Sequence, residues 1–425
     1  MDLSRRQLFT TLGAGAIAAS VPVRTTARTE TSARAGDPSD FAAVRADFPW
    51  TRQKVWLAAA EFHPFSVHTM EAIDRYSRYR ALGPGEDRQT FAPDQQTETK
   101  RLYASLINAK PDEIAFVLST TDGENLVVAG MDLTRRGGNV VIDDLHFNAS
   151  KYLYTMLQRD AGLELRVVHH RNWTTHVDDM DKAIDRNTRL VSMALVSNVN
   201  GFLQDAKAIS DIAHARGAYV YADVIQAAGA TPIDIKAMGI DFAASSTYKW
   251  LMGDFGFGFL YVRSDLQGTV VRQTRWGLRQ VSEERSNFEF EVKPGAARYE
   301  GTSSLSNLSG LCAYEGLKYV TRLGVENIRE HAKPLTDRLQ KELPALGYPS
   351  ITPMQNPTPI VSFLASDPET TQKKLEKAFG GERVVSSRKW EMTEGGTTKT
   401  VNGLRIGVSV YSNQEDVDRL LNALA

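Results

Sequence analysis

The sequence contains a single cysteine, Cys312, among 425 residues. One cysteine forms no internal disulfide, so a disulfide-stabilised scaffold is excluded. Neither sign of charge dominates, since 50 lysines and arginines face 51 aspartates and glutamates, and composition gives no electrostatic reason to expect a nucleic acid partner. Beyond the N-terminus no apolar run is long enough for a membrane span. With 42% hydrophobic residues, the chain is instead expected to be a soluble globular protein of enzyme size.

Metal-binding motifs are also missing. The sequence has no HExxH pattern and no cluster of cysteine and histidine, so no metal site is expected. The adjacent pair His169-His170 closes a predicted strand, where neighbouring side chains point to opposite faces. We therefore expect the two rings to diverge and not to chelate one metal ion.

Residues 1–35 are typical of an export signal. Arg5 and Arg6 precede the mildly apolar stretch LFTTLGAGAIAASVPV, and Ala33-Arg34-Ala35 has a small-x-small cleavage pattern. This order resembles a twin-arginine signal, which predicts export by the twin-arginine translocation machinery to the periplasm or medium. The alternative is a short amphipathic helix with two chance arginines. The twin-arginine route carries folded proteins, often with a cofactor, so the signal also indicates one.

From about residue 112 short apolar runs alternate with amphipathic stretches. This alternation predicts an α/β fold with a mostly parallel, doubly wound sheet and helices on both faces. The helix in DAKAISDIAHARG is expected to end at Gly217, and GFGFLYVR is expected to add a strand antiparallel to its neighbours. The other predicted strands are EIAFVLS, NVVIDDL, LELRVVH, TRLVSMALVS, AYVYADV and DFAASST.

The sequence pattern divides the chain into four predicted parts, of which the signal is the first. After the signal, residues 36–100 form an N-terminal segment that packs on a smaller domain. Residues 101–305 form the large domain, and residues 306–425 form a linking helix and a small α+β domain. The linking helix is expected over about 305–325, and the small domain ends in strand-like LRIGVSVY and helix-like NQEDVDRLLNAL.

One group of polar residues has the side-chain types that ligand binding and catalysis use. Asp223 ends a strand, and Lys249 follows the next strand along the chain. The carboxyl ends of neighbouring parallel strands meet at the edge where such sheets bind ligands. The turn Ser119-Thr120-Thr121-Asp122-Gly123 follows the first strand and begins a helix, where exposed N–H groups suit a phosphate. A structural salt bridge and an ordinary N-cap are the alternatives.

An amine, a carboxylate and an anion cradle together meet the needs of pyridoxal 5′-phosphate. The amine forms a Schiff base, the carboxylate keeps the ring nitrogen protonated, and the cradle holds the phosphate. A close carboxylate–pyridinium pair is worth about 4 kcal/mol at an effective dielectric near 20, enough to keep the ring protonated near neutral pH.

From about residue 50 onwards the chain resembles the class V aminotransferases of pyridoxal-phosphate fold type I. The nearest branch is that of cysteine desulfurases, selenocysteine lyases and isopenicillin N epimerases. The resemblance is carried by Asp223-Val224-Ile225-Gln226, Ser246-Thr247-Tyr248-Lys249, Thr120-Thr121-Asp122-Gly123-Glu124-Asn125, Ser197-Asn198-Val199-Asn200-Gly201 and Glu300-Gly301-Thr302. It implies a cofactor-binding large domain and a homodimer in which Thr302 reaches the neighbouring site.

The resemblance also assigns roles to single residues. It implies Lys249 as the Schiff-base lysine, Asp223 on the ring nitrogen and Gln226 on the ring hydroxyl. The other implied cofactor ligands are Thr120, Thr121, Asp122, Phe147, Asn198, Ser246, Tyr248, Gly301 and Thr302, with Phe147 stacked on the ring. Arg405 resembles the arginine that holds the substrate carboxylate, although a solvated strand face explains it too. His63 is a second candidate at the substrate entrance, although a surface turn before Pro64 explains it equally well.

Departures from the family pattern limit the predicted reaction. Desulfurases use a loop cysteine to accept sulfur, and the corresponding stretch, residues 385–390, has none. Cys312 lies in an apolar helix pattern, which argues against a persulfide-forming desulfurase. Phe147 replaces a histidine able to move protons, so Lys249 is left as the acid and base at Cα.

The sequence therefore predicts a pyridoxal-phosphate enzyme acting on an amino acid or the amino group of an exported metabolite. Aminotransfer is the main expectation, and carbon–sulfur lysis or epimerisation is the alternative. A non-catalytic exported binding protein with this fold is a third possibility.

Overall fold

The computed structural model describes residues 41–286, 288–394 and 397–425. The predicted export signal, residues 1–35, lies outside these ranges. Among the described residues, no helix combines the length and apolar character needed to cross a bilayer.

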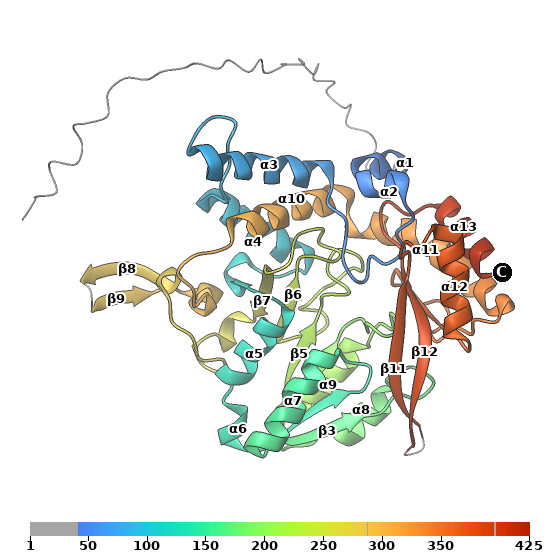
Figure 1. The fold of residues 1–425 in the computed structure, drawn as a ribbon. Helices are drawn as coiled ribbons and strands as arrows, with labels where there is room; N and C mark the ends of the chain where they lie inside the picture. Colours follow the sequence, from blue (N-terminus) through green and yellow to red (C-terminus); the bar gives the residue numbers. More distant parts are fainter. Residues whose placement is uncertain (1–40, 287, 395–396) are drawn as a thin grey trace, which may run out of the picture. The chain divides into compact units, whose positions relative to one another are not determined.

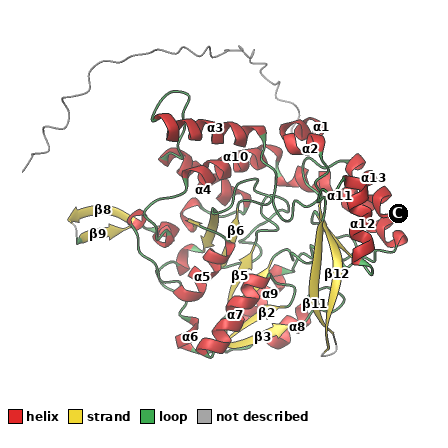
Figure 2. Ribbon diagram, viewed as in Figure 1, coloured by secondary structure: helices red, strands yellow, loops and turns green. Residues whose placement is uncertain are grey.

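A seven-stranded sheet forms the centre of the large α/β region (Figures 1 and 2). Its strand order is β1-β7-β6-β5-β4-β2-β3, and β2 to β6 run parallel. As predicted, GFGFLYVR forms a strand, β7, that is antiparallel to both neighbours. The strands are β1 (Ile114–Val117), β2 (Asn139–Asp143), β3 (Glu164–Val168), β4 (Thr188–Ala194), β5 (Tyr219–Asp223), β6 (Phe242–Ser246) and β7 (Gly258–Val262).

Helices cover both faces of this sheet (Figure 2). The alternation of side chains along β2 shows why, because Val140 and Ile142 pack in one buried cluster and Val141 in another. The cluster of Val140 includes Leu126 of helix α5, and the cluster of Val141 includes Ile209 of helix α9. The α/β class predicted from the sequence, with a mostly parallel sheet and helices on both faces, is confirmed.

A second, three-stranded antiparallel sheet has the order β10-β12-β11 and its own hydrophobic cluster with α11, α12 and α13. Residues 55–60 run along its β12 strand, where Gly407 N–H donates to Leu57 and Ala59 N–H donates to Gly407. A separate hairpin, β8–β9, projects from the large region (Figure 1). These strands are β8 (Val281–Ser286), β9 (Glu289–Val292), β10 (Ile360–Leu364), β11 (Ser386–Glu394) and β12 (Thr397–Gly407).

The long helix expected near residues 305–325 is α10, which packs against α3 and α4 (Figure 1). The predicted domain boundaries themselves stay predictions. The helices are α1 (Phe41–Val44), α2 (Pro49–Gln53), α3 (Val67–Leu82), α4 (Pro93–Leu106), α5 (Thr120–Gly130), α6 (Leu133–Arg136), α7 (Asn148–Ala161), α8 (Val177–Ala183), α9 (Ala206–Ala215), α10 (Asn307–Leu323), α11 (Val325–Glu342), α12 (Pro368–Phe379) and α13 (Gln414–Leu424).

Close packing between α5 and β6 fixes the start of α5. A Cβ atom on Gly123 would lie 2.7 Å from the Cβ of Ala244, which is closer than two non-bonded carbon atoms approach each other. We expect Gly123→Ala to lower the free energy of unfolding by about 1–3 kcal/mol, because the helix must move off the sheet. Urea unfolding measures this loss, and unchanged stability would contradict the tight contact.

Candidate active site

The carboxyl ends of three adjacent parallel strands open into one cavity of about 90 Å³. Ala194 ends β4, Asp223 ends β5 and Ser246 ends β6, and all three line it. The remaining lining residues are Ser119, Thr120, Thr121, Phe147, Val196, Asn198, Ile225, Gln226, Tyr248 and Lys249. The structure therefore brings together most of the residues singled out in the sequence, at the predicted edge of the sheet.

The turn before α5 forms one wall of the cavity. Ser119 caps the helix, and its hydroxyl accepts a hydrogen bond from Asp122 N–H. Thr120 is bound to the end of β6 in both directions, since its N–H donates to Ser246 Oγ at 2.9 Å and its Oγ1 accepts from Ser246 N–H at 2.9 Å. The turn is therefore an N-cap, and it also presents a helix N-terminus and hydroxyls to the cavity, an arrangement that favours an anion.

Lys249 and Asp223 are both buried beside this turn, with 6% and 4% of their surface exposed. Burial lowers the pKa of the Lys249 amine, and the charge of Arg405 lowers it further, while Asp223 opposes the shift. Burial raises the pKa of the Asp223 carboxyl, against the hydrogen bond from Ile225 N–H at 2.9 Å and the attraction of Lys249. The pair shares one low-dielectric pocket and is not a solvated salt bridge.

Phe147 and Asn198 also line the cavity. The centre of the Phe147 ring lies 5.9 Å from Lys249 Nζ, and the ring is 39% exposed. An exposed phenyl ring at a cavity mouth is not a core residue, which favours the predicted stacking role. Asn198 Oδ1 is buried in the cavity with no hydrogen-bond partner in the described structure. A buried unpaired acceptor of this kind is available for a hydrogen bond from a ligand.

Gln226 and Tyr248 complete the inner wall. The Gln226 amide donates to Ala60 O at 3.0 Å and accepts from Trp250 Nε1 at 2.9 Å, so its orientation is fixed. The Tyr248 ring stacks on Phe255 with centroids 4.2 Å apart.

Arg405 lies above the cavity on β12 and is buried, with 3% of its surface exposed. Its guanidinium donates to Asn198 O at 2.8 Å, and its Nε is buried without a partner. No carboxylate within the described ranges forms an ion pair with it. Burial lowers its pKa to about 9, and the nearby Arg388 adds to the shift. A buried cation without an anionic partner favours the binding of an anion, and the solvated strand face considered from the sequence is excluded.

Besides Arg405, four predicted site residues do not line the cavity. Asp122 turns away and accepts from Leu118 N–H at 3.1 Å and from Arg275. His63 is buried against Phe48 and Tyr411, with its Nε2 2.9 Å from Ser409 Oγ, so it packs inside the protein and not in a surface turn at the entrance. The other two, Gly301 and Thr302, follow the short 3-10 helix Gly295–Tyr299, and their role toward a neighbouring subunit stays a prediction.

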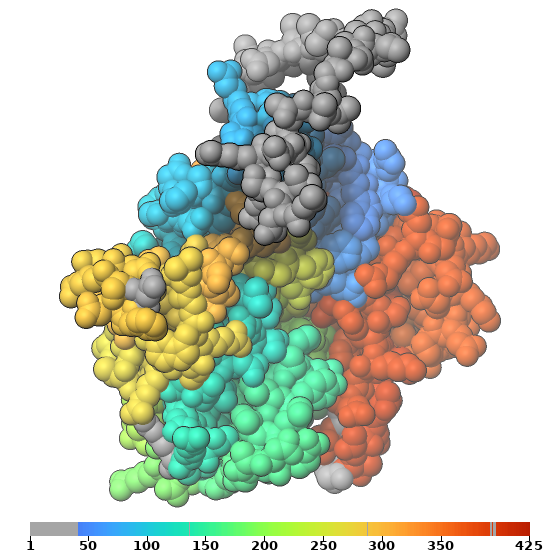
Figure 3. Space-filling model, turned by 60° about the vertical axis from the view of Figure 1, so that its left-hand side comes forward, coloured from blue at the N-terminus to red at the C-terminus, as the bar shows by residue number. Residues whose placement is uncertain are grey.

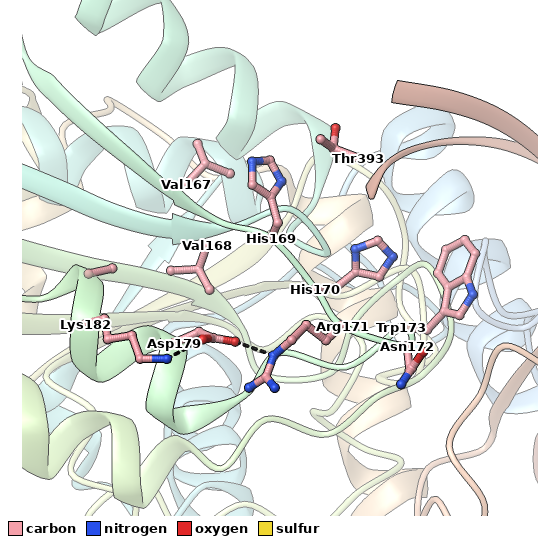
Figure 4. A pocket seen from close by; sticks show the side chains of 11 residues that line it. Val167, Val168, His169, His170, Arg171, Asn172, Trp173, Asp179, Lys182 and Thr393 are labelled. Atoms are coloured by element: carbon pink, nitrogen blue, oxygen red, sulfur yellow. Dashed lines mark hydrogen bonds and ion pairs between the residues drawn. The ribbon is translucent and has the colours of Figure 1, made fainter. Parts of the chain in front are cut away.

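The expectation that the rings of His169 and His170 diverge is wrong. Both Nδ1 atoms lie near Asp144 Oδ2, at 3.0 and 3.2 Å, so the two rings converge on one carboxylate. The reason is that β3 ends at Val168, and the strand alternation no longer applies beyond it. Both histidines line a second pocket (Figure 4), beside Arg171 and Trp173. Within the described residues, no three His, Cys, Asp or Glu side chains are placed to hold a metal ion.

The comparison with protein families identifies the family of this chain. Residues 66–420 match the family described as "Aminotransferase class-V". The chain belongs to the class V aminotransferase family. That match spans both sheets and every cavity residue named above. It confirms the family predicted from the sequence and the predicted cofactor, since this family is pyridoxal-phosphate dependent.

Individual relatives of this class V protein carry names from sulfur chemistry. It is 30% identical over 345 residues to a probable cysteine desulfurase of Methanothermobacter thermautotrophicus, covering 79% of this chain and 85% of the relative. It is 28% identical over 394 residues to a cysteine desulfurase of Escherichia coli K12, covering 90% and 96%.

Solved structures show the same fold. An apo cysteine desulfurase from Thermococcus onnurineus superposes with a TM-score of 0.77 at 24% identity, over 90% of this chain and 96% of that one. A cystine C–S lyase in complex with its reaction product cysteine persulfide superposes with a TM-score of 0.75 at 19% identity, over 89% and 98%.

The residues present fit pyridoxal phosphate. The turn at 119–121 offers backbone and hydroxyl donors to a phosphate, Lys249 offers an amine, and Asp223 offers a carboxylate at the other wall. The unpaired Asn198 Oδ1 is the independent observation, because this buried acceptor is free to take a hydrogen bond from a bound group such as a ring hydroxyl.

Sequence reasoning missed the outer part of the site. Glu61, Lys151, Trp173, Arg388 and Trp390 line a larger cleft that opens from the cavity. They come from four separate segments, and no local motif marks them. The period-two pattern of β11 is the one available signal, since it places Arg388 and Trp390 on one side of the strand.

Proposed function

We propose that this protein is a pyridoxal-phosphate-dependent carbon–sulfur lyase, which expels a thiol from a cysteine derivative and passes no sulfur to a cysteine of its own. One observation carries this proposal: the amine, carboxylate and guanidinium of the site converge, while Cys312 is fully buried in α10. The names of the relatives favour sulfur chemistry over the aminotransfer that the sequence first suggested.

The cofactor would be held by the turn at 119–121 at its phosphate, by Asp223 and Asn198 at its ring, and by Lys249 through a covalent link. When bound, pyridoxal phosphate supplies an electron sink that makes the substrate Cα–H acidic. The Phe147 ring at the mouth limits the access of water to the ring face.

The protein's own residues then carry out binding and proton transfer. Arg405 binds the α-carboxylate through its guanidinium, which lacks any other anion. Lys249, once free, takes the proton from Cα, and burial favours the neutral amine that this step needs. The Cβ–S bond breaks with its electron pair on sulfur, and the thiolate takes up a proton. Overall, a cysteine thioether and water give a thiol, pyruvate and ammonium.

Cys312 is unable to act as the sulfur acceptor of a desulfurase. It has no exposed surface, and burial raises the pKa of its thiol to about 12. Attack on sulfur requires an accessible thiolate, and Cys312 offers neither access nor charge. With no other cysteine in the sequence, the expelled sulfur must leave with its substituent.

The expected result is that Cys312→Ala keeps turnover within about twofold of wild type, because the thiol only fills space. The measurement incubates the pyridoxal-phosphate-loaded protein with S-methylcysteine and quantifies methanethiol and pyruvate, which are expected in equal amounts. Loss of thiol release in Cys312→Ala, with folding intact, would instead indicate a desulfurase in which Cys312 accepts the sulfur.

The same assay separates the other candidate reactions. A keto acid that keeps its sulfur substituent would indicate aminotransfer, and inverted stereochemistry at Cα would indicate epimerisation. No product from any amino acid would favour the non-catalytic binding protein.

We also propose that the protein is exported through the twin-arginine signal and acts as a homodimer in the periplasm or medium. The paired Arg5 and Arg6 support export. The exposed position of Thr302 beyond the 3-10 helix Gly295–Tyr299 supports a contact with the site of a second copy.

A further inference from the structure

A large cleft extends the active site outward from Lys249. Its volume is about 1010 Å³, against about 90 Å³ for the inner cavity. Residues of the β11–β12 hairpin line one side of the cleft, and residues of the large region line the other. In Figures 1 and 3 the red segment that contains this hairpin lies beside the green part of the large region. Pockets of this size accommodate extended ligands, so the space exceeds what a small amino acid occupies.

The cleft carries an excess of positive charge. Six lysines and arginines line it, against the three carboxylates of Glu61, Asp144 and Glu391. Two of these carboxylates already have partners, since Asp144 meets His169 and His170, and Glu61 meets two arginines. The cleft therefore favours substrates with more than one negative charge.

Arg388 is the cation best placed to receive a second charge. Its Nη2 donates to Glu61 Oε1 at 2.7 Å, while its Nε is buried without a hydrogen-bond partner. Arg383 binds the same Glu61 carboxylate, so the triad of Arg383, Glu61 and Arg388 keeps one net positive charge. Arg388 lies on β11 directly beside β12, the strand that carries Arg405. Burial lowers the pKa of Arg405, and the charge of Arg388 adds to this shift.

Aromatic rings continue the cleft beyond Arg388. Trp390 of β11 and Trp173 meet edge to face with centroids 6.4 Å apart, and His170 lies 5.0 Å from Trp173. Trp173 is held at φ +64°, a conformation that costs a bulky residue energy, and its carbonyl accepts from Asn200 at 2.8 Å. His170 and Trp173 also border the pocket of Figure 4, so the cleft and that pocket share a wall.

Resting on the function proposed above, we propose that the substrate is a cysteine thioether whose sulfur substituent carries a second carboxylate, and that Arg388 binds this carboxylate. Arg405 receives the α-carboxylate, and Arg388 receives the distal one. Any atoms beyond it lie against Trp390 and Trp173. Arg388 is thus a specificity-determining residue and takes no part in bond breaking.

The test compares S-(2-carboxyethyl)cysteine with its neutral amide, S-(2-carbamoylethyl)cysteine, which has nearly the same shape. The wild-type holoprotein is expected to prefer the acid by about tenfold to a hundredfold in kcat/KM, mainly through KM, as a hydrogen bond to a charged group provides. Arg388→Gln is expected to reduce this preference to about one. The matched control Arg383→Gln removes an arginine from the same Glu61 but leaves the Arg388 guanidinium in place, so a smaller but clear preference for the acid is expected to remain.

A binding measurement separates this proposal from the proposed function. 2-Aminopimelate has carbon in place of the sulfur of S-(2-carboxyethyl)cysteine and undergoes no C–S cleavage. Calorimetry is expected to show tighter binding of 2-aminopimelate than of its ω-amide to the wild-type holoprotein, and no such difference for Arg388→Gln. This result holds even where no thiol is released, in which case the lyase assignment alone fails.

Equal binding of acid and amide by the wild type would overturn the proposal, because Arg388 would then serve only as a structural partner of Glu61. So would a preference that survives in Arg388→Gln. If that variant fails to fold, Arg388→Lys keeps the charge without the Nε donor, and a preference as large as in wild type would equally contradict the assignment.

Discussion

Replacing Lys249 with alanine is expected to lower turnover by at least about 10³-fold. The amine is the one group in the inner cavity able both to link the cofactor and to move the Cα proton, and general acid–base catalysis alone contributes about 10²–10⁴. The absorption band of lysine-linked pyridoxal phosphate is expected to disappear in the same variant. Thiol release and the absorption spectrum of the purified protein measure the two effects.

Lys236→Ala provides the control for this experiment, because Lys236 is exposed and does not line the site. Far-ultraviolet circular dichroism confirms that both variants fold. Retention of more than about a tenth of wild-type turnover by Lys249→Ala would show that another group takes the proton.

Replacing Arg405 with glutamine is expected to lower kcat/KM by roughly 10²–10³, because a buried charge-assisted contact with the α-carboxylate is lost. The same change is expected to raise the free energy of unfolding of the substrate-free protein by about 1 kcal/mol. The reason is that the buried guanidinium has no carboxylate partner to offset its loss of hydration, and burial lowers its pKa. Steady-state kinetics and urea unfolding measure the two opposite effects.

Arg405→Lys tests the geometry of the contact. It keeps a positive charge but loses the planar two-pronged donor, so an intermediate loss of about tenfold in kcat/KM is expected. Reduced stability of Arg405→Gln together with unchanged kinetics would mean that Arg405 supports the fold through its hydrogen bond to Asn198 and binds no substrate.

The inner site was predictable from the sequence because its residues follow the sheet. Thr121, Asp223 and Ser246 come at the ends of strands or the start of a helix, and parallel strands present those ends at one edge. The strands themselves were predictable from their apolar runs, because strands of a sheet covered on both faces consist of nearly continuous hydrophobic segments.

The outer site depended on tertiary contacts that no local pattern encodes. Arg388 reaches the cleft because β11 pairs with β12 in a register that the sequence does not specify. Asp122 fits the family motif but forms an ion pair with Arg275 from a distant loop. From the sequence, His63 is a candidate for the substrate entrance or part of a surface turn, but its ring is buried with Nε2 2.9 Å from Ser409 Oγ, a residue far along the chain.

Lys249, in the pocket between Asp223 and the turn at 119–121, is expected to carry the cofactor. Borohydride reduction of the pyridoxal-phosphate-loaded protein, followed by proteolysis and mass spectrometry, tests it most directly. We predict one pyridoxyl group per chain, on the peptide that contains Lys249. A label on any other lysine, or no label on a protein that binds the cofactor, would contradict the account.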